Sequence, residues 1–104
     1  MLAFYLLVKD VVCNLNLCSE QELLHSKQEY LTDARYLLVF LLRKKLTNQE
    51  IVRLTHLPKQ SISRIVNGYD CRKKQKYSLR CMQQEAENIM NKSINLVPQL
   101  SLYS

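Results

Sequence analysis

The scarcity of turn-forming residues is the feature that most constrains the fold of this chain. Its 104 residues include one glycine and two prolines. A sheet of many strands needs such residues between its strands, whereas the leucine, lysine, glutamine and glutamate that are plentiful here are good helix formers. The length and a hydrophobic fraction of 47% are enough for one core. We therefore predict an all-α fold, a bundle of five to six helices over residues 1–92, with a loosely ordered tail over residues 93–104.

Capping signals and apolar periodicity divide residues 1–46 into three helices. The apolar face of the first helix consists of Phe4, Val8, Val11, Val12 and Leu15. Ser19 and Glu22 have the spacing of a capping box, which predicts a short helix to about His25 and then a polar loop over residues 26–30. Thr32 is the predicted N-cap of the next helix. That helix is apolar on nearly every side over residues 34–42, so we expect it to be the buried centre of the bundle.

The positive charge of the chain is concentrated in its middle. Residues 43–80 hold eleven basic and two acidic side chains, whereas the segments before and after them carry net charges of −2 and −1. A surplus that only favoured solubility would have no reason to concentrate, but a surface that binds a polyanion would. A solvated basic face is the alternative, and charge alone does not decide between the two.

Residues 47–68 have the pattern of a helix-turn-helix. Thr47 and Glu50 form a second capping box, so a helix begins near residue 48. Pro58 disfavours helical geometry at the residue before it and fits the start of a new helix, which predicts a turn at residues 56–57. The second helix starts at residue 59 and has an inward face of Ile62, Ile65, Val66 and Tyr69. Asn67 and Gly68 predict its end.

The opposite face of this second helix carries polar side chains and no carboxylate. An ordinary solvated helix more often carries pairs of glutamate and lysine. Arginine can bind guanine through two hydrogen bonds, glutamine and asparagine can bind adenine in the same way, and serine can bind either base. We therefore predict that the helix reads base edges of double-stranded DNA through Lys59, Gln60, Ser61, Ser63, Arg64 and Asn67.

The same residues resemble two families of DNA-binding proteins. Residues 47–68 resemble, without a gap, the helix-turn-helix of phage repressors and of the lactose-repressor family, including the run QSISRIVNG at residues 60–68. His56 stands where those families favour glycine. Residues 8–69 are similar to the C-terminal domain of the bacterial replication initiator DnaA, in the TrpR-like/DnaA-like superfamily. The similarity rests on VVC at residues 11–13, ELL at 22–24, SK at 26–27, AR at 34–35 and LTN at 46–48.

The DnaA resemblance implies how such a domain would meet DNA. The second helix of the motif would enter the major groove, and the loop before the long apolar helix would touch the minor groove through Lys27. The DnaA signature GGRDHTT is replaced here by HLPKQSI at residues 56–62, and the loop reads SKQE at residues 26–29. We therefore expect an initiator-like architecture with a different target sequence. We expect no ATPase activity, because the chain has no glycine-rich phosphate loop.

Basic residues outside the reading helix are predicted to contact DNA phosphates, which gives salt-sensitive affinity without sequence information. With the cap residue of the motif, they are Arg43, Lys44, Lys45, Thr47, Arg72, Lys73, Lys74 and Lys76. A solvated basic linker over residues 70–76 is the alternative for the last four. A final helix, ending near residue 91, has an apolar face of Leu79, Met82, Ala86, Ile89 and Met90. This face would pack on its own domain or, less commonly, form a homodimer contact.

These features predict a sequence-specific binder of double-stranded DNA that regulates transcription or replication in the cytoplasm of a bacterium. A protein-interaction module that uses the helix face over residues 79–90 is one alternative, and an RNA-binding basic domain is another. A partner module would not need its charge centred on residues 43–80. The reading helix lacks the exposed aromatic side chains typical of single-strand recognition.

Neither a metal, a cofactor nor an enzymatic activity is predicted. Cys13, Cys18, Cys71 and Cys81 form no C-x-x-C pair, and no histidine has zinc-finger spacing after them. His25 and His56 have no carboxylate in a catalytic pattern. The apolar residues 1–8 are too short to span a membrane and lack the basic region of a signal peptide, so we expect no membrane partner.

Overall fold

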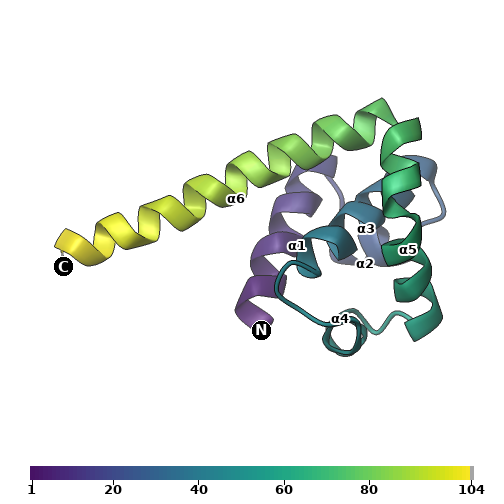
Figure 1. Ribbon diagram of the computed structural model, residues 1–104, viewed down its shortest axis with the longest axis horizontal. Coiled ribbons are helices and arrows are strands. Elements are labelled where there is room, and N and C mark those ends of the chain that lie inside the picture. The colour runs from purple at the N-terminus through teal and green to yellow at the C-terminus, as the bar shows by residue number, and fades with distance from the viewer. Residues whose placement is uncertain (104) are drawn as a thin grey trace.

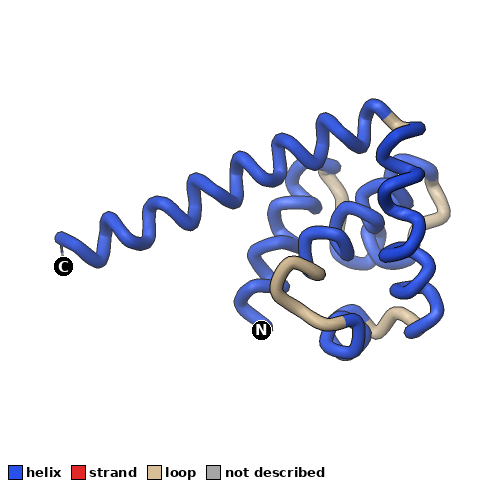
Figure 2. The backbone as a smooth tube through the Cα atoms, in the orientation of Figure 1, coloured by secondary structure: helices blue, strands red, loops and turns tan. Residues whose placement is uncertain are grey.

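Six helices make up the described part of the chain. The computed structural model describes the backbone of residues 1–103 and the side chains of residues 1–92. The helices are α1 (Leu2–Asn16), α2 (Glu20–His25), α3 (Glu29–Leu42), α4 (Asn48–Thr55), α5 (Lys59–Gln75) and α6 (Tyr77–Tyr103), as Figure 1 shows. Short connections join them, and no strand occurs in these residues (Figure 2). The all-α prediction is confirmed.

The buried face of α1 and the start of α2 agree with the signals in the sequence. Val8 and Val12 are fully buried, and Phe4 and Leu15 pack against the core at its edge. The Ser19 hydroxyl accepts a hydrogen bond from the Glu22 N–H at 3.2 Å, and the Glu22 carboxylate accepts one from the Ser19 N–H at 3.1 Å. The predicted capping box is therefore confirmed.

The start of α3 differs from the prediction. The helix begins at Glu29 after Gln28, which caps it without a side-chain hydrogen bond. Thr32 lies one turn inside the helix, where its hydroxyl donates to the Gln28 carbonyl at 3.0 Å. The predictions that Thr32 is the N-cap and that the loop extends to Tyr30 are therefore wrong. A threonine hydroxyl can bond to the carbonyl four residues earlier, so it tolerates a helical position, and the negative charge of Glu29 favours the first turn.

The helix α3 is the centre of the bundle, as predicted. It packs against α1, α2, α5 and α6. Figure 1 shows it between α1 on one side and α5 on the other. Its apolar run is fully buried at Leu37, Leu38, Val39, Leu41 and Leu42. A helix that is apolar on all sides needs partners on all sides, and here the other helices supply them.

The helix α5 is longer than predicted. It continues through Gly68, which has no positive φ, and ends only at Gln75. The predicted stop at Asn67 and Gly68 is wrong, and so is the interpretation of residues 70–76 as a linker. A glycine inside a helix costs about 1 kcal/mol relative to alanine. Burial of the next residue offsets this cost: the Tyr69 ring stacks on Phe40 with centroids 4.2 Å apart, and its hydroxyl donates to Gln83 at 2.6 Å.

One residue, Lys76, separates α5 from α6, and the first turns of α6 pack on the bundle. Leu79, Ala86 and Met90 are buried, Met82 is half-buried, and Ile89 is 40% exposed. The helix continues to Tyr103, so the predicted end near residue 91 is wrong. The loosely ordered tail predicted over residues 93–104 stays a prediction. Figure 1 shows the distal part of α6 extending away from the other helices. The side chains of residues 93–104, and Ser104 altogether, lie outside the described residues.

Candidate nucleic-acid interface

The first helix of the predicted motif, α4, is held at its start by a capping box. The Thr47 hydroxyl accepts from the Glu50 N–H at 3.2 Å, and the Glu50 carboxylate accepts from the Thr47 N–H at 3.0 Å. These hydrogen bonds stabilise the charged carboxylate and lower the pKa of Glu50. The prediction that Thr47 and Glu50 begin a helix at Asn48 is confirmed.

The turn between α4 and α5 is built from four consecutive residues with separate tasks. The Thr55 hydroxyl donates to the Ile51 carbonyl at 2.7 Å and accepts from the Leu57 N–H at 3.2 Å. His56 adopts the left-handed conformation with φ of 61°, at the position where glycine would fit more easily. Leu57 is buried, and Pro58 is the N-cap of α5. The predicted turn at residues 56–57 is confirmed.

The helix α5 has one buried face and one exposed polar face. Ile62, Ile65 and Tyr69 are buried in the core. The exposed face is a single stripe along the helix that consists of Gln60, Arg64, Asn67, Cys71 and Lys74. We call these residues the α5 stripe. Because the helix is continuous through Gly68, the predicted base reader Arg64 and the predicted phosphate contact Lys74 share one face.

The remaining predicted base readers lie at the edges of this stripe. Lys59 is exposed at the first position of α5, whereas Ser61 and Ser63 are half-buried on its two flanks. No carboxylate occurs between Lys59 and Tyr69, and Asp70 is the first acidic residue after them. The first half of α5, residues 59–69, is the predicted reading half. It therefore presents amide, hydroxyl and cationic groups and no negative charge.

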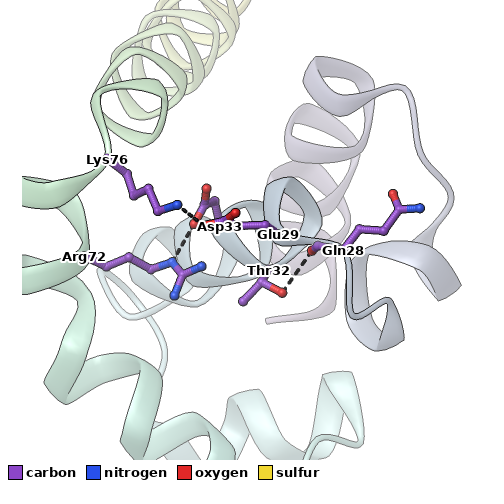
Figure 3. A network of polar contacts seen from close by, with 6 residues as sticks. All are labelled: Gln28, Glu29, Thr32, Asp33, Arg72 and Lys76. Carbon is purple, nitrogen blue, oxygen red and sulfur yellow. Dashed lines mark hydrogen bonds and ion pairs between the residues drawn. The ribbon is translucent and has the colours of Figure 1, made fainter.

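Two ion pairs tie the C-terminal part of α5 to the start of α3 (Figure 3). Arg72 Nε lies 2.5 Å from an Asp33 carboxylate oxygen, and the Arg72 guanidinium covers the Tyr36 ring at 4.6 Å from its centroid. Lys76 pairs with Glu29. The Asp33 side chain is only 5% exposed, so Arg72 neutralises a buried charge. Two of the predicted phosphate contacts, Arg72 and Lys76, are thus already paired with carboxylates of α3, Arg72 with a buried one and Lys76 with an exposed one.

The segment between α3 and α4 carries three exposed basic residues, Arg43, Lys44 and Lys45. Arg43 donates to the Leu46 carbonyl at 3.1 Å. Lys44 lies 3.2 Å from Glu87 of α6, and the Lys45 ammonium lies 5.2 Å from the centre of the Phe4 ring of α1. Lys44 and Lys45 are therefore directed toward α6 and α1, and no contact joins them to the α5 stripe.

The connection between α2 and α3, which carries the exposed Lys27, is anchored by Arg35. Arg35 donates to the carbonyl oxygens of Leu23 at 2.8 Å and Ser26 at 2.5 Å. Burial lowers the pKa of this guanidinium. The sequence prediction missed the roles of Asp33 and Arg35. The available signal was that both are charged and border a run of apolar residues, where a charge needs a partner.

All four cysteines are free, and no group of three or more His, Cys, Asp or Glu side chains within the described residues could hold a metal ion. Within those residues, no helix has both the length and the apolar character needed to span a membrane.

No protein-family model matches the chain, and neither a curated protein nor a solved structure is significantly similar to it. The resemblance to the DnaA C-terminal domain therefore stays a prediction.

Proposed function

We propose that this protein binds double-stranded DNA in a sequence-specific manner by placing α5 in the major groove. The observation that carries the proposal is the α5 stripe: an exposed polar face without a carboxylate, on a helix whose opposite face is buried in the core and whose preceding turn is anchored by the buried Leu57. The major groove admits an α-helix, and the amides of Gln60 and Asn67 suit adenine edges. Lys59, Ser61, Ser63 and Arg64 complete the base-reading set.

Phosphate contacts flank the reading helix in this proposal. Lys73 and Lys74 stand at the far end of α5, and Thr47 and Arg43 precede α4. Lys74 lies ten residues after Arg64, a rise of about 15 Å along a helix. This length lets one end of α5 read bases while the other end reaches the DNA backbone. Lys27, on the connection before α3, would contact the minor groove.

The proposal includes an initiator-like architecture and a regulatory role in transcription or replication, within the cytoplasm of a bacterium. Its support is the order of elements, in which a capped short helix and a long buried helix precede the helix-turn-helix. The alternative interaction module is less well supported, because Leu79, Ala86 and Met90 of its proposed face are already covered by the chain's own core. An RNA-binding role lacks an exposed aromatic on the reading half of α5, since Tyr69 is buried.

Selection from a random duplex library tests the proposal, followed by titration of the enriched and scrambled duplexes at two salt concentrations. We expect an enriched motif that is bound far more tightly than its scrambled control. Gln60→Ala and Asn67→Ala should each reduce the preference at one base pair by about 1–3 kcal/mol. The matched controls Gln84→Ala and Asn88→Ala remove the same groups from exposed positions of α6 and should change nothing.

Equal and steeply salt-dependent binding to both duplexes would mean that the chain is a non-specific basic domain. An absence of binding at either salt concentration would refute the proposed function and favour the interaction module. A palindromic enriched motif would indicate that a homodimer binds two half-sites, whereas a single half-site would indicate a monomer.

A further inference from the structure

A cavity of about 260 Å³ opens between α3 and the reading half of α5. Its polar lining comes from Thr32 and Arg35 of α3 and from Ser61 and Arg64 of α5, and Leu24 and Ile65 form apolar wall. The cavity therefore lies directly beside the α5 stripe, and Arg64 belongs to both surfaces.

The two arginines that line this cavity have no negative partner. Arg35 donates only to two carbonyl oxygens, and Arg64 forms no ion pair among the described residues. By contrast, Arg72, the other arginine that contacts α3, is neutralised by Asp33. No carboxylate lines the cavity. Burial disfavours the uncompensated charge of Arg35, and the exposed Arg64 adds a second positive charge at the mouth of the same cavity, so an anion placed there would be attracted by both.

The remaining groups at the cavity suit an anion with several oxygen atoms. Ser61, which lines the cavity, is half-buried and lies in the first turn of α5. Pro58 caps that helix without a side-chain hydrogen bond, so the backbone N–H of Ser61 has no cap side chain as acceptor. Guanidinium groups match the geometry of phosphate and carboxylate oxygens, and the apolar wall strengthens such contacts by lowering the local dielectric.

We propose that this cavity binds one oxyanion of the phosphate class, held by Arg35 and Arg64 with the Ser61 hydroxyl. The group has two possible sources, a phosphodiester of the DNA backbone or a free phosphate ester. The first source rests on the proposed function and the second does not. The proposal assigns the Arg64 guanidinium to a phosphate in place of a base edge, and leaves base reading on the α5 stripe to Gln60 and Asn67.

The first arm of the test uses inorganic phosphate and the isolated protein. Titration at constant ionic strength, balanced with sodium chloride, is followed by NMR of the backbone amides and of the arginine Nε–H groups. We expect saturable shifts at Ser61, Arg35 and Arg64, and at least tenfold weaker binding by Arg64→Gln, the loss typical of one charge-assisted hydrogen bond. Arg53→Gln is the matched control, since Arg53 is exposed on α4 outside the cavity. Arg35 stays unchanged because it anchors the α2–α3 connection.

The second arm uses the enriched duplex with a neutral methylphosphonate placed at one phosphate at a time. If the cavity holds a backbone phosphate, one substitution should weaken wild-type binding about tenfold and should have no effect on Arg64→Gln. Arg64→Gln should also weaken all duplexes by the same factor and leave the base preferences intact.

The two arms separate the outcomes. Saturable phosphate binding without any duplex binding would support a free phosphate ester and refute only the proposed function. A methylphosphonate effect that depends on Arg64 would support the DNA source. Any of three results would overturn the inference. The first is that phosphate causes no saturable shift and no methylphosphonate effect depends on Arg64. The second is that Arg53→Gln and Arg64→Gln weaken phosphate binding equally, and the third is that Arg64→Gln loses the preference at a single base pair.

Discussion

Removal of the Arg72 guanidinium should lower the free energy of unfolding by about 3 kcal/mol. Asp33 is 5% exposed, and Arg72 is its ion-pair partner at 2.5 Å. Taking one partner from a buried pair costs about 3–5 kcal/mol, because the other charge stays behind without compensation. The lower end applies here because the Arg72 side chain is itself 24% exposed, so water can reach the remaining carboxylate. Loss of the contact with the Tyr36 ring contributes about 0.5–1 kcal/mol of this.

Chemical denaturation of Arg72→Met, Asp33→Asn and the double variant measures the effect. Asp33→Asn should cost less, about 1–2 kcal/mol, because the freed arginine can turn to solvent. The double variant should lose less than the sum of the single variants, with a coupling of about 1–3 kcal/mol. In thermal unfolding, a loss of 3 kcal/mol corresponds to a melting temperature about 12–24 °C lower for a domain of this size.

Lys74→Met is the control for this prediction, since Lys74 is exposed on the same helix. It should change the free energy of unfolding by less than about 0.5 kcal/mol. If Arg72→Met were no more destabilising than Lys74→Met, or if the two single variants were additive, the Asp33–Arg72 pair would not hold α5 against α3. Arg72 would then again be a candidate phosphate contact.

Four further predictions test the turn, the helix and the charge. Gly68→Ala should stabilise the protein by about 1 kcal/mol in urea denaturation, because Gly68 is inside α5 and an added Cβ would meet Tyr36 at 3.9 Å; a destabilised variant would place it at a helix end. His56→Gly should raise the free energy of unfolding by about 0.5–1 kcal/mol by relieving the left-handed conformation, and an unchanged melting temperature would contradict that. The pKa of Glu50 is lowered in the folded state, so its contribution to stability is present above its ordinary value of 4.5 and disappears as the pH falls through the lower folded value. Glu50→Gln should accordingly lose less stability on acidification than wild type, and parallel acid-unfolding curves would exclude this source. Lys73→Ala should weaken binding to all duplexes equally and reduce the salt slope by about one, whereas an unchanged slope would leave Lys73 in solvent.

Local signals in the sequence were sufficient for the helix-turn-helix and for most of the helices. Both capping boxes were predictable because their partners lie three residues apart, as at Thr47 and Glu50. The turn at His56 was predictable from Pro58, whose ring acts on the residue just before it. The polar and apolar faces of α5 follow from the period of the helix, so the exposed positions of Gln60 and Asn67 agree with the pattern.

The same local rules failed where a distant contact outweighed them. Gly68 is a good helix stop by local preference, but the stacking of Tyr69 on Phe40 and its hydrogen bond to Gln83 carry α5 past it. At Gly68, tertiary packing therefore decided a helix end that local preference left balanced within about 1 kcal/mol. At Thr32 the competing signals were themselves local: Glu29 favours the first turn of α3, and the Thr32 hydroxyl bonds to the Gln28 carbonyl one turn earlier.

The candidate site depends both on local sequence and on tertiary structure. The sequence by itself determined the charge-rich segment, the turn and the face of α5, since these depend on residues within one or two turns of a helix. Only the tertiary structure decided which cations are available: Arg72 is neutralised by Asp33, 39 residues earlier in the chain, while Arg35 and Arg64 line a common cavity without a negative partner. Such pairings depend on how the helices pack around α3, and no short-range periodicity encodes a contact between residues so far apart.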